Sequence, residues 1–382
     1  MKYYPFFLYC SYIALLLCSL YAQSTETDPH WQKLVDNYSQ HLKQQLKKQG
    51  IPGGALAIVN IGHADHIEGI GFTKVKNGLS VNSNTRFRLA SVSKTFAGSL
   101  TAKLAAQGEF SLDDPVSMFI PEFANTVYKD DLKVFHLLSH SSGLVPNAYD
   151  NLIESRMNYA DIVAKLLAVQ PICEPGLCYG YQNVMFNLIN SVILKSTAMD
   201  YTHWLNKFIF APLQMRNASV GFSAMTKDEN YAHPHVRGRS RWYTARLKKN
   251  YYKVAAAAGV NASASDMAIW LKAQLGQYPS VLPLAALIKQ TRPYTDTKKE
   301  LYRRVWRNHV KQAHYGLGWR VYNYDDEILY YHSGWVQGYR SDIVILPQQN
   351  IGFSLILNAE TGLINELTTE FINRVLAYKR AK

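Results

Sequence analysis

The chain has 382 residues, of which 48% are hydrophobic and 18% charged, so it can bury a sizeable core and is not a disordered or fibrous protein. Its formal net charge of +13 comes from Lys2 and two segments: 236–253 holds seven Lys or Arg and no acid, and 298–311 holds six with one Glu. Because the rest of the chain is neutral, the charge indicates two local patches and not a generally basic, nucleic-acid-coating protein.

The N-terminus predicts an export signal over residues 1–22. Lys2 precedes an uncharged run, 5–22, which ends in the small residue Ala22 and is followed by polar residues. An uncleaved membrane anchor is the alternative, because the run is close to the length that spans a bilayer. We therefore expect residues 23–382 to form a periplasmic or secreted protein.

Strands are predicted near both ends of the chain and helices in the middle. An amphipathic helix is expected over 31–47, and the segment from about 92 to 310 is mostly helical with long loops. A last amphipathic helix is expected over 363–378. Short apolar runs bounded by turn residues predict strands at 55–60, 67–72, 316–322, 327–331, 342–346 and 352–357.

This order predicts an α/β fold in which the two ends of the chain pair into one antiparallel sheet. The sheet region is expected to comprise about 31–75 and 313–382, with the terminal helices covering it. A large, mainly helical insert is expected over about 76–312. Clefts between such regions are the usual places for active sites.

Ser91 and Lys94 form the strongest chemical signal. Their spacing puts both side chains on one face if a helix starts near Ser91, and a helix start favours negative charge such as an oxyanion. A serine nucleophile needs a base within hydrogen-bond reach, and a lysine serves where burial neutralises its amine. Ser-x-x-Lys alone is a weak pattern that also fits an N-cap serine followed by a surface lysine.

Tyr181 and Asn183 form the second signal. Residues two apart point the same way in an extended or loop segment, so a phenol and an amide are expected to face one cleft. A nearby ammonium favours the phenolate of a tyrosine, so Tyr181 and Lys94 could share one proton as a coupled base. A core tyrosine beside an asparagine turn is the alternative interpretation.

His332, Gly334 and Trp335 form the third signal, at the end of a predicted strand. Gly334 permits a substrate to approach the backbone closely. The backbone N–H of Trp335 is expected to join that of Ser91 as an oxyanion hole. A strand end with a solvated histidine is the alternative.

Together these motifs resemble the serine β-lactamase and penicillin-binding protein superfamily. The Tyr-x-Asn form is similar to its branch of class C β-lactamases, D-alanyl-D-alanine carboxypeptidases and family VIII esterases. The resemblance runs from about Trp31 to the C-terminal helix. Further stretches similar to this branch are 137–144, 212–215, 257–267 and 315–319.

The resemblance implies that Ser91 is the acylated nucleophile and that Lys94 and Tyr181 are its base system. It also implies that Asn183 hydrogen-bonds either the substrate amide or Lys94. His140 lies beside two serines and looks triad-like, but in this branch its stretch is structural, so we leave it out of the site.

His332 is the main departure from the branch, because many members carry the lysine of a Lys-Thr-Gly motif at this position. A histidine is only partly charged near neutral pH, whereas a permanent cation suits a substrate carboxylate. We therefore expect His332 to face the substrate and to read its charge through its own titration. The replacement shifts the expectation towards esterases and broader hydrolases.

Cys173 and Cys178 are the cysteines outside the predicted signal. In an exported protein a disulfide closing this short loop is favoured, with two free thiols as the alternative. Histidine pairs such as His233 and His235 lack partners at ligand spacing, so neither a metal nor another cofactor is expected.

The sequence therefore predicts an exported serine hydrolase that forms an acyl-enzyme on a D-alanyl peptide, an ester or a β-lactam. A catalytically idle envelope binding protein and a nucleic-acid binder are the competing hypotheses. Intact Ser91, Lys94 and Tyr181 argue against the first, and the export signal argues against the second. The basic segments could instead rim the cleft and bind an anionic envelope polymer such as peptidoglycan, or form a solvated face.

Overall fold

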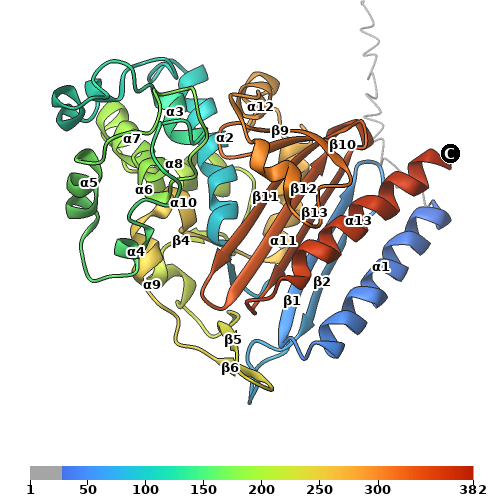
Figure 1. The fold of residues 1–382 in the computed structure, drawn as a ribbon. Helices are drawn as coiled ribbons and strands as arrows, with labels where there is room; N and C mark the ends of the chain where they lie inside the picture. The colour runs from blue at the N-terminus through green and yellow to red at the C-terminus, as the bar shows by residue number, and fades with distance from the viewer. Residues whose placement is uncertain (1–27, 382) are drawn as a thin grey trace, which may run out of the picture.

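The computed structural model describes residues 28–381, and the predicted signal over 1–22 lies outside this range. Its main element is an antiparallel sheet of eight strands: β1 Gly53–Asn60, β2 His66–Gly71, β8 Thr295–Asp296, β9 Val310–Tyr315, β10 Arg320–Tyr324, β11 Glu327–Val336, β12 Tyr339–Leu346 and β13 Ile351–Leu357. The spatial order is β2-β1-β13-β12-β11-β10-β9-β8 (Figure 1). The two ends of the chain meet where β1 pairs with β13, which confirms the expected α/β fold.

Two long helices, α1 Pro29–Lys48 and α13 Leu363–Arg380, lie side by side on one face of the sheet (Figure 1). Helix α1 begins after Asp28, whose side chain accepts hydrogen bonds from the first backbone N–H groups of the helix. The apolar stripes of both helices pack on sheet residues such as Leu56 and Phe353. This burial explains the helical periodicity of both segments.

The opposite face of the sheet is covered by the segment between β2 and β8. Its core includes Ala57, Ile343 and Ile356 of the sheet, so the central strands are buried on both faces. The α-helices of this segment are α2 Ser93–Ala106, α3 Val134–Leu138, α4 Asp150–Ile153, α5 Tyr159–Leu167, α6 Asn183–Asn187, α7 Ile189–Thr197, α8 Tyr201–Leu205, α9 Phe222–Met225, α10 Ala255–Ala258, α11 Ala264–Gln274 and α12 Leu284–Thr291. No helix within residues 28–381 is long and apolar enough to cross a bilayer.

Short elements complete this segment. They are the strands β3 Phe87–Arg88, β4 Ser219–Val220, β5 His235–Arg237, β6 Trp242–Thr244 and β7 Val260–Ala262, and the short helices η1 Ala90–Val92, η2 Val116–Met118, η3 Pro121–Asn125, η4 Asn206–Phe210 and η5 Asn250–Lys253. Outside it, η6 Lys298–Tyr302 lies between β8 and β9, and η7 Pro347–Gln349 lies between β12 and β13. Strands β5 and β6 form a hairpin of their own.

The structure differs from the predicted strands at three points. The strand expected over 316–322 begins only at Arg320, because Gly316 and Trp319 close a turn in which the Gly316 N–H donates to the Trp319 carbonyl at 2.7 Å. Strand β9 was not predicted, and it lies at the expected boundary between the helical insert and the sheet region. Strand β11 continues to Val336, so the motif that starts at His332 lies inside a strand and not at its end.

One edge of β11 stays open beside this motif. Strand β12 pairs with β11 as far as Val336, whereas the pairing with β10 ends at Tyr331. No other strand within residues 28–381 pairs with β11 beyond that point. Alternate backbone N–H and C=O groups of an antiparallel strand point towards each edge, so the open edge presents polar groups to a ligand.

Candidate active site

Ser91 lies in η1, the short turn that leads into α2. In the run 85–104 it is the one residue that is not buried. Its neighbour Ala90 has φ +48°, a left-handed conformation that is rare for alanine and costs about 1–3 kcal/mol. The turn is fixed to the sheet because the Leu89 carbonyl accepts a hydrogen bond from Ser341 Oγ at 2.6 Å. The backbone is thus strained at Ala90, directly before the one residue of this run that is not buried.

Lys94 lies one turn further along and is fully buried. Its Nζ donates to Asn183 Oδ1 at 2.6 Å and to the Ala257 carbonyl at 3.0 Å, and it lies 3.3 Å from Ser91 Oγ. Burial lowers the pKa of Lys94 well below its usual value, against an opposing attraction from Asp150. When the Lys94 amine is neutral and two of its N–H groups are hydrogen-bonded, its lone pair can accept the proton of the Ser91 hydroxyl, as a general base requires.

Tyr181 reaches the same hydroxyl from the loop before α6. Its side chain is hydrogen-bonded to Ser91, and its ring centroid lies 4.7 Å from Lys94 Nζ. Burial raises the pKa of Tyr181 well above its usual value, although the bond to Ser91 opposes this. Burial therefore favours the neutral amine of Lys94 and the protonated phenol of Tyr181, whereas we considered a phenolate beside an ammonium.

Asn183 begins α6 and connects Lys94 with Asp150. Its Oδ1 accepts from Lys94, and its Nδ2 donates to Asp150 Oδ2 at 2.8 Å. We expected Asn183 to hydrogen-bond either the substrate amide or Lys94, and in the structure it hydrogen-bonds Lys94. Asp150 was missed in the sequence, because it lies in α4 with no motif spacing that connects it to Asn183.

His332 does not have the surroundings that we expected. The side chain is fully buried, with Nε2 2.6 Å from the Tyr315 hydroxyl and Nδ1 2.8 Å from the Ser333 carbonyl. Burial lowers the pKa of His332 well below its usual value, and the nearby charges of Arg320 and Lys94 lower it further. The structure thus gives His332 two protein partners and a lowered pKa, whereas we expected a ring that faces the substrate and titrates near neutral pH.

Gly334 is needed for packing inside the protein. A Cβ at this position would lie 2.2 Å from the Leu89 carbonyl oxygen and 2.2 Å from Ser341 Oγ. The absence of a side chain lets β11 approach the turn that carries Ser91. The neighbouring Trp335 is 65% exposed, and its indole N–H donates to Glu360 at 3.1 Å.

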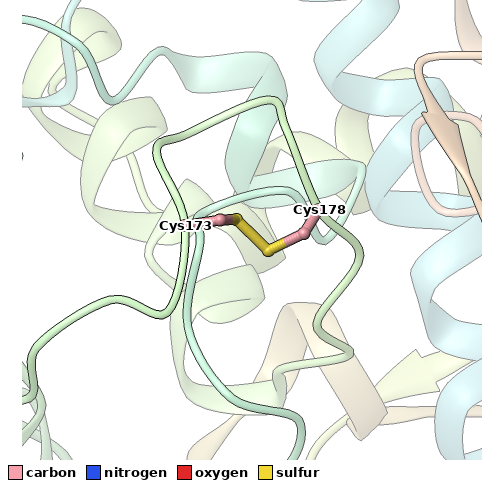
Figure 2. Close-up of a disulfide and its surroundings, with 2 residues drawn as sticks. All are labelled: Cys173 and Cys178. Carbon is pink, nitrogen blue, oxygen red and sulfur yellow. A yellow bond between two sulfur atoms is a disulfide. The ribbon is translucent and has the colours of Figure 1, made fainter.

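The approach to Tyr181 is stiffened by a disulfide between Cys173 and Cys178 (Figure 2). The bridged loop packs against the stretch that contains His140, where the Gly180 N–H donates to the His140 carbonyl at 2.8 Å. The His140 ring accepts the Gln182 N–H at 3.1 Å and lies 4.2 Å from the Tyr181 ring. His140 therefore supports the loop that carries Tyr181.

The described part of the chain contains no group of three His, Cys, Asp or Glu side chains arranged to hold a metal ion. The site brings together a serine, a lysine whose pKa is lowered, a tyrosine whose pKa is raised and an open strand edge. This set can accept a proton from Ser91 and return one to a leaving group, as acyl transfer requires.

Comparisons with known proteins agree with this arrangement. The family model described as Beta-lactamase matches residues 38–375. Protein flp of Staphylococcus aureus (strain MW2) is 24% identical over 360 residues, covering 91% of this chain and 67% of that protein. A beta-lactamase of Yersinia enterocolitica is 26% identical over 306 residues, covering 79% of this chain and 72% of that protein.

Solved structures show the same fold. The octameric penicillin-binding protein homologue from Pyrococcus abyssi has a TM-score of 0.76 at 23% identity, covering 85% of this chain and 74% of that one. A class C beta lactamase has a TM-score of 0.73 at 20% identity, covering 91% of this chain and 98% of that one.

Proposed function

We propose that this chain, which belongs to the Beta-lactamase family, is an exported serine hydrolase that acts through an acyl-enzyme on Ser91. The observation that supports this best is the position of Lys94. Its Nζ is buried, has a lowered pKa and lies 3.3 Å from Ser91 Oγ, which belongs to the one residue of the run 85–104 that is not buried. A fold that only binds a ligand has no need for a buried amine at this place.

In the proposed acylation step, Ser91 Oγ attacks the substrate carbonyl carbon and its proton passes to Lys94 Nζ. The carbonyl oxygen becomes an oxyanion, which the backbone N–H groups of Ser91 and Trp335 stabilise. A proton then passes from Lys94 through the Tyr181 hydroxyl to the leaving alcohol or amine. The leaving group departs protonated, and Ser91 carries the acyl group as an ester.

Deacylation reverses the direction of proton transfer. A water molecule gives a proton to the pair formed by Lys94 and Tyr181 and attacks the acyl carbon. The bond to Ser91 Oγ breaks, and the serine recovers its proton. The acid leaves, and the side chains return to their starting protonation states.

We further propose that uncharged acyl groups, above all esters, are the preferred substrates. The branch often has a lysine where this chain has His332, and here the ring is buried with both nitrogens engaged. This position supplies no fixed cation for a substrate carboxylate, so D-alanyl peptides and penicillins lose one attractive contact. Export is supported by the Cys173–Cys178 bridge, because such bridges persist in oxidising compartments.

The test is a substrate panel with one purified protein and its Ser91→Ala variant. Short-chain p-nitrophenyl esters, a chromogenic cephalosporin and a D-alanyl-D-alanine peptide are compared by kcat/KM. We expect ester hydrolysis to exceed the other two and to disappear in Ser91→Ala. Preferred turnover of the peptide or the cephalosporin would overturn the ester assignment, and activity that persists in Ser91→Ala would overturn the mechanism.

A further inference from the structure

A cavity of about 680 Å³ lies between the C-terminal end of α1 and the hairpin of β5 and β6. Figure 1 shows this hairpin next to the end of α1, at the bottom of the view. The charged residues that line the cavity are all cations, namely Lys47, Lys48, Lys76, Arg237 and Arg241. We call this site the basic cavity. None of the residues placed in the active site lines it.

The basic segment 298–311 provides a contrast, because the fold neutralises much of it. Arg303 pairs with Glu300 at 2.9 Å, and Lys311 pairs with Asp326 at 2.6 Å. Arg304 pairs with an acid of α13. Three of the six cations of this segment are therefore paired with acids.

The basic segment 236–253 behaves differently in its two halves. Lys253 donates to the carbonyls of Ser155 and Met157, both at 2.6 Å, so it fixes the loop after α4. In the hairpin, by contrast, Arg237 and Arg241 form no ion pair with any residue of 28–381. The fold adds three lysines from distant parts of the chain to them, which increases the repulsion.

The hairpin and its Arg237 are fixed to the end of α1. Arg237 Nη1 and Trp242 Nε1 both donate to the Gln49 carbonyl at 3.0 Å, which joins the hairpin to the end of α1. Trp242 is buried in the core beneath α1. The hairpin therefore cannot easily move away from α1 to separate the cations. A bound polyanion would relieve the repulsion among them.

The aromatic rings of the cavity are already covered by guanidinium groups. Arg237 lies over the Trp242 ring at 5.3 Å and Arg241 over the Tyr243 ring at 4.9 Å. Proteins that bind single-stranded nucleic acid use open aromatic faces on which bases stack. A concave site is also poorly matched to a flat bilayer. Charge along a flexible chain is what the basic cavity can recognise.

We propose that the basic cavity binds an acidic polysaccharide, whose carboxylate, sulfate or phosphate groups pair with its five cations. The site is separate from Ser91, so binding does not depend on turnover. Release of counterions makes such binding strongly salt-dependent, and each cation that contacts the polymer adds about one to the slope of log Kd against log salt.

The experiment measures binding of a heparin octasaccharide to the Ser91→Ala protein by calorimetry at several salt concentrations. One variant carries three substitutions in the cavity, Lys47→Gln, Lys48→Gln and Lys76→Gln. The matched control removes the same charge from the other basic segment through Lys298→Gln, Lys299→Gln and Arg307→Gln. All six side chains are exposed, and none forms an ion pair within residues 28–381.

We expect the cavity variant to lose at least about tenfold in affinity and its salt slope to fall by about two to three, whereas the control changes less than about twofold. No binding, or equal losses in both variants, would overturn the proposal. Tighter binding of an oligothymidylate of equal charge would indicate a nucleic-acid site instead. Binding to phosphatidylglycerol vesicles without binding to the octasaccharide would indicate a membrane site. Ester hydrolysis by the cavity variant in a Ser91 background shows separately whether the proposed enzyme works.

Discussion

Replacement of Asp150 perturbs the base system without touching Ser91 or Lys94. The carboxylate accepts the Asn183 Nδ2–H at 2.8 Å, and this bond turns Asn183 Oδ1 towards Lys94 Nζ. The charge of Asp150 also raises the pKa of Lys94, against the larger lowering by burial. Asp150 is therefore a positioning residue with a separable electrostatic effect.

The size of each effect follows from these contacts. A hydrogen bond to a charged group contributes about 1.5–3 kcal/mol, so Asp150→Ala is expected to lower kcat/KM by about 10- to 100-fold. Asp150→Asn keeps an acceptor for Asn183 Nδ2 and removes only the charge. Its plateau value of kcat/KM is expected to fall by less than about tenfold, while the pKa of Lys94 falls.

The assay is kcat/KM for one uncharged p-nitrophenyl ester between pH 5 and 10. Activity requires unprotonated Lys94, so kcat/KM rises with pH through the pKa of this residue. In Asp150→Asn the rise is expected at lower pH than in the wild type. Asp161→Asn, which removes an exposed carboxylate from α5, should leave the profile unchanged. The reasoning would be refuted if the rise of kcat/KM in Asp150→Asn occurred at the wild-type pH or at higher pH. Full activity of Asp150→Ala would refute it as well.

Three further predictions concern other residues of the site. Lys94→Ala and Tyr181→Phe should each abolish most ester turnover and the double variant little more, since they act as one proton-transfer unit; losses that multiply would argue against this. Gly334→Ala should lower Tm by several degrees in a thermal melt and activity by at least about tenfold, because its Cβ would lie 2.2 Å from a buried carbonyl oxygen. The control Gly362→Ala, with no atom within 4 Å of the added Cβ, should change neither Tm nor activity. Because burial lowers the pKa of His332, a neutral and an anionic ester should show the same dependence of kcat/KM on pH between 5 and 8, and a separate step near 6.5 for the anionic ester would show that the ring titrates.

The outer layers of the fold were predictable because one face of each element packs on a core. The stripes of α1 and α13 and the apolar runs of β1 and β13 report that packing directly. Strand β9 was not predictable in this way. Only Val310, Ala313 and Tyr315 are buried in it, and buried and exposed residues do not alternate regularly along the strand. The turn at Gly316 was likewise missed, because it depends on the hydrogen bond between Gly316 and Trp319 and no strong turn motif marks it in the sequence.

The site residues divide in the same way. Ser91, Lys94 and Tyr181 could be chosen as candidates because their spacing within short motifs reflects local chemistry, and the structure brings them together. Asp150 was missed, and His332 was misjudged, because their roles depend on neighbours that are distant in the sequence. The burial of His332 and its contact with Tyr315 are tertiary facts, and no periodicity of the strand could show that both ring nitrogens are occupied.

The central claim is that Ser91 is the nucleophile and that Lys94 activates it. Intact-mass analysis after treatment with a fluorophosphonate tests this most directly. We predict one adduct on the wild-type protein, none on Ser91→Ala, and at least about 100-fold slower labelling of Lys94→Ala, because removal of a general base typically costs 10²–10⁴-fold. An adduct that persists on Ser91→Ala, or labelling of Lys94→Ala at the wild-type rate, would contradict the account.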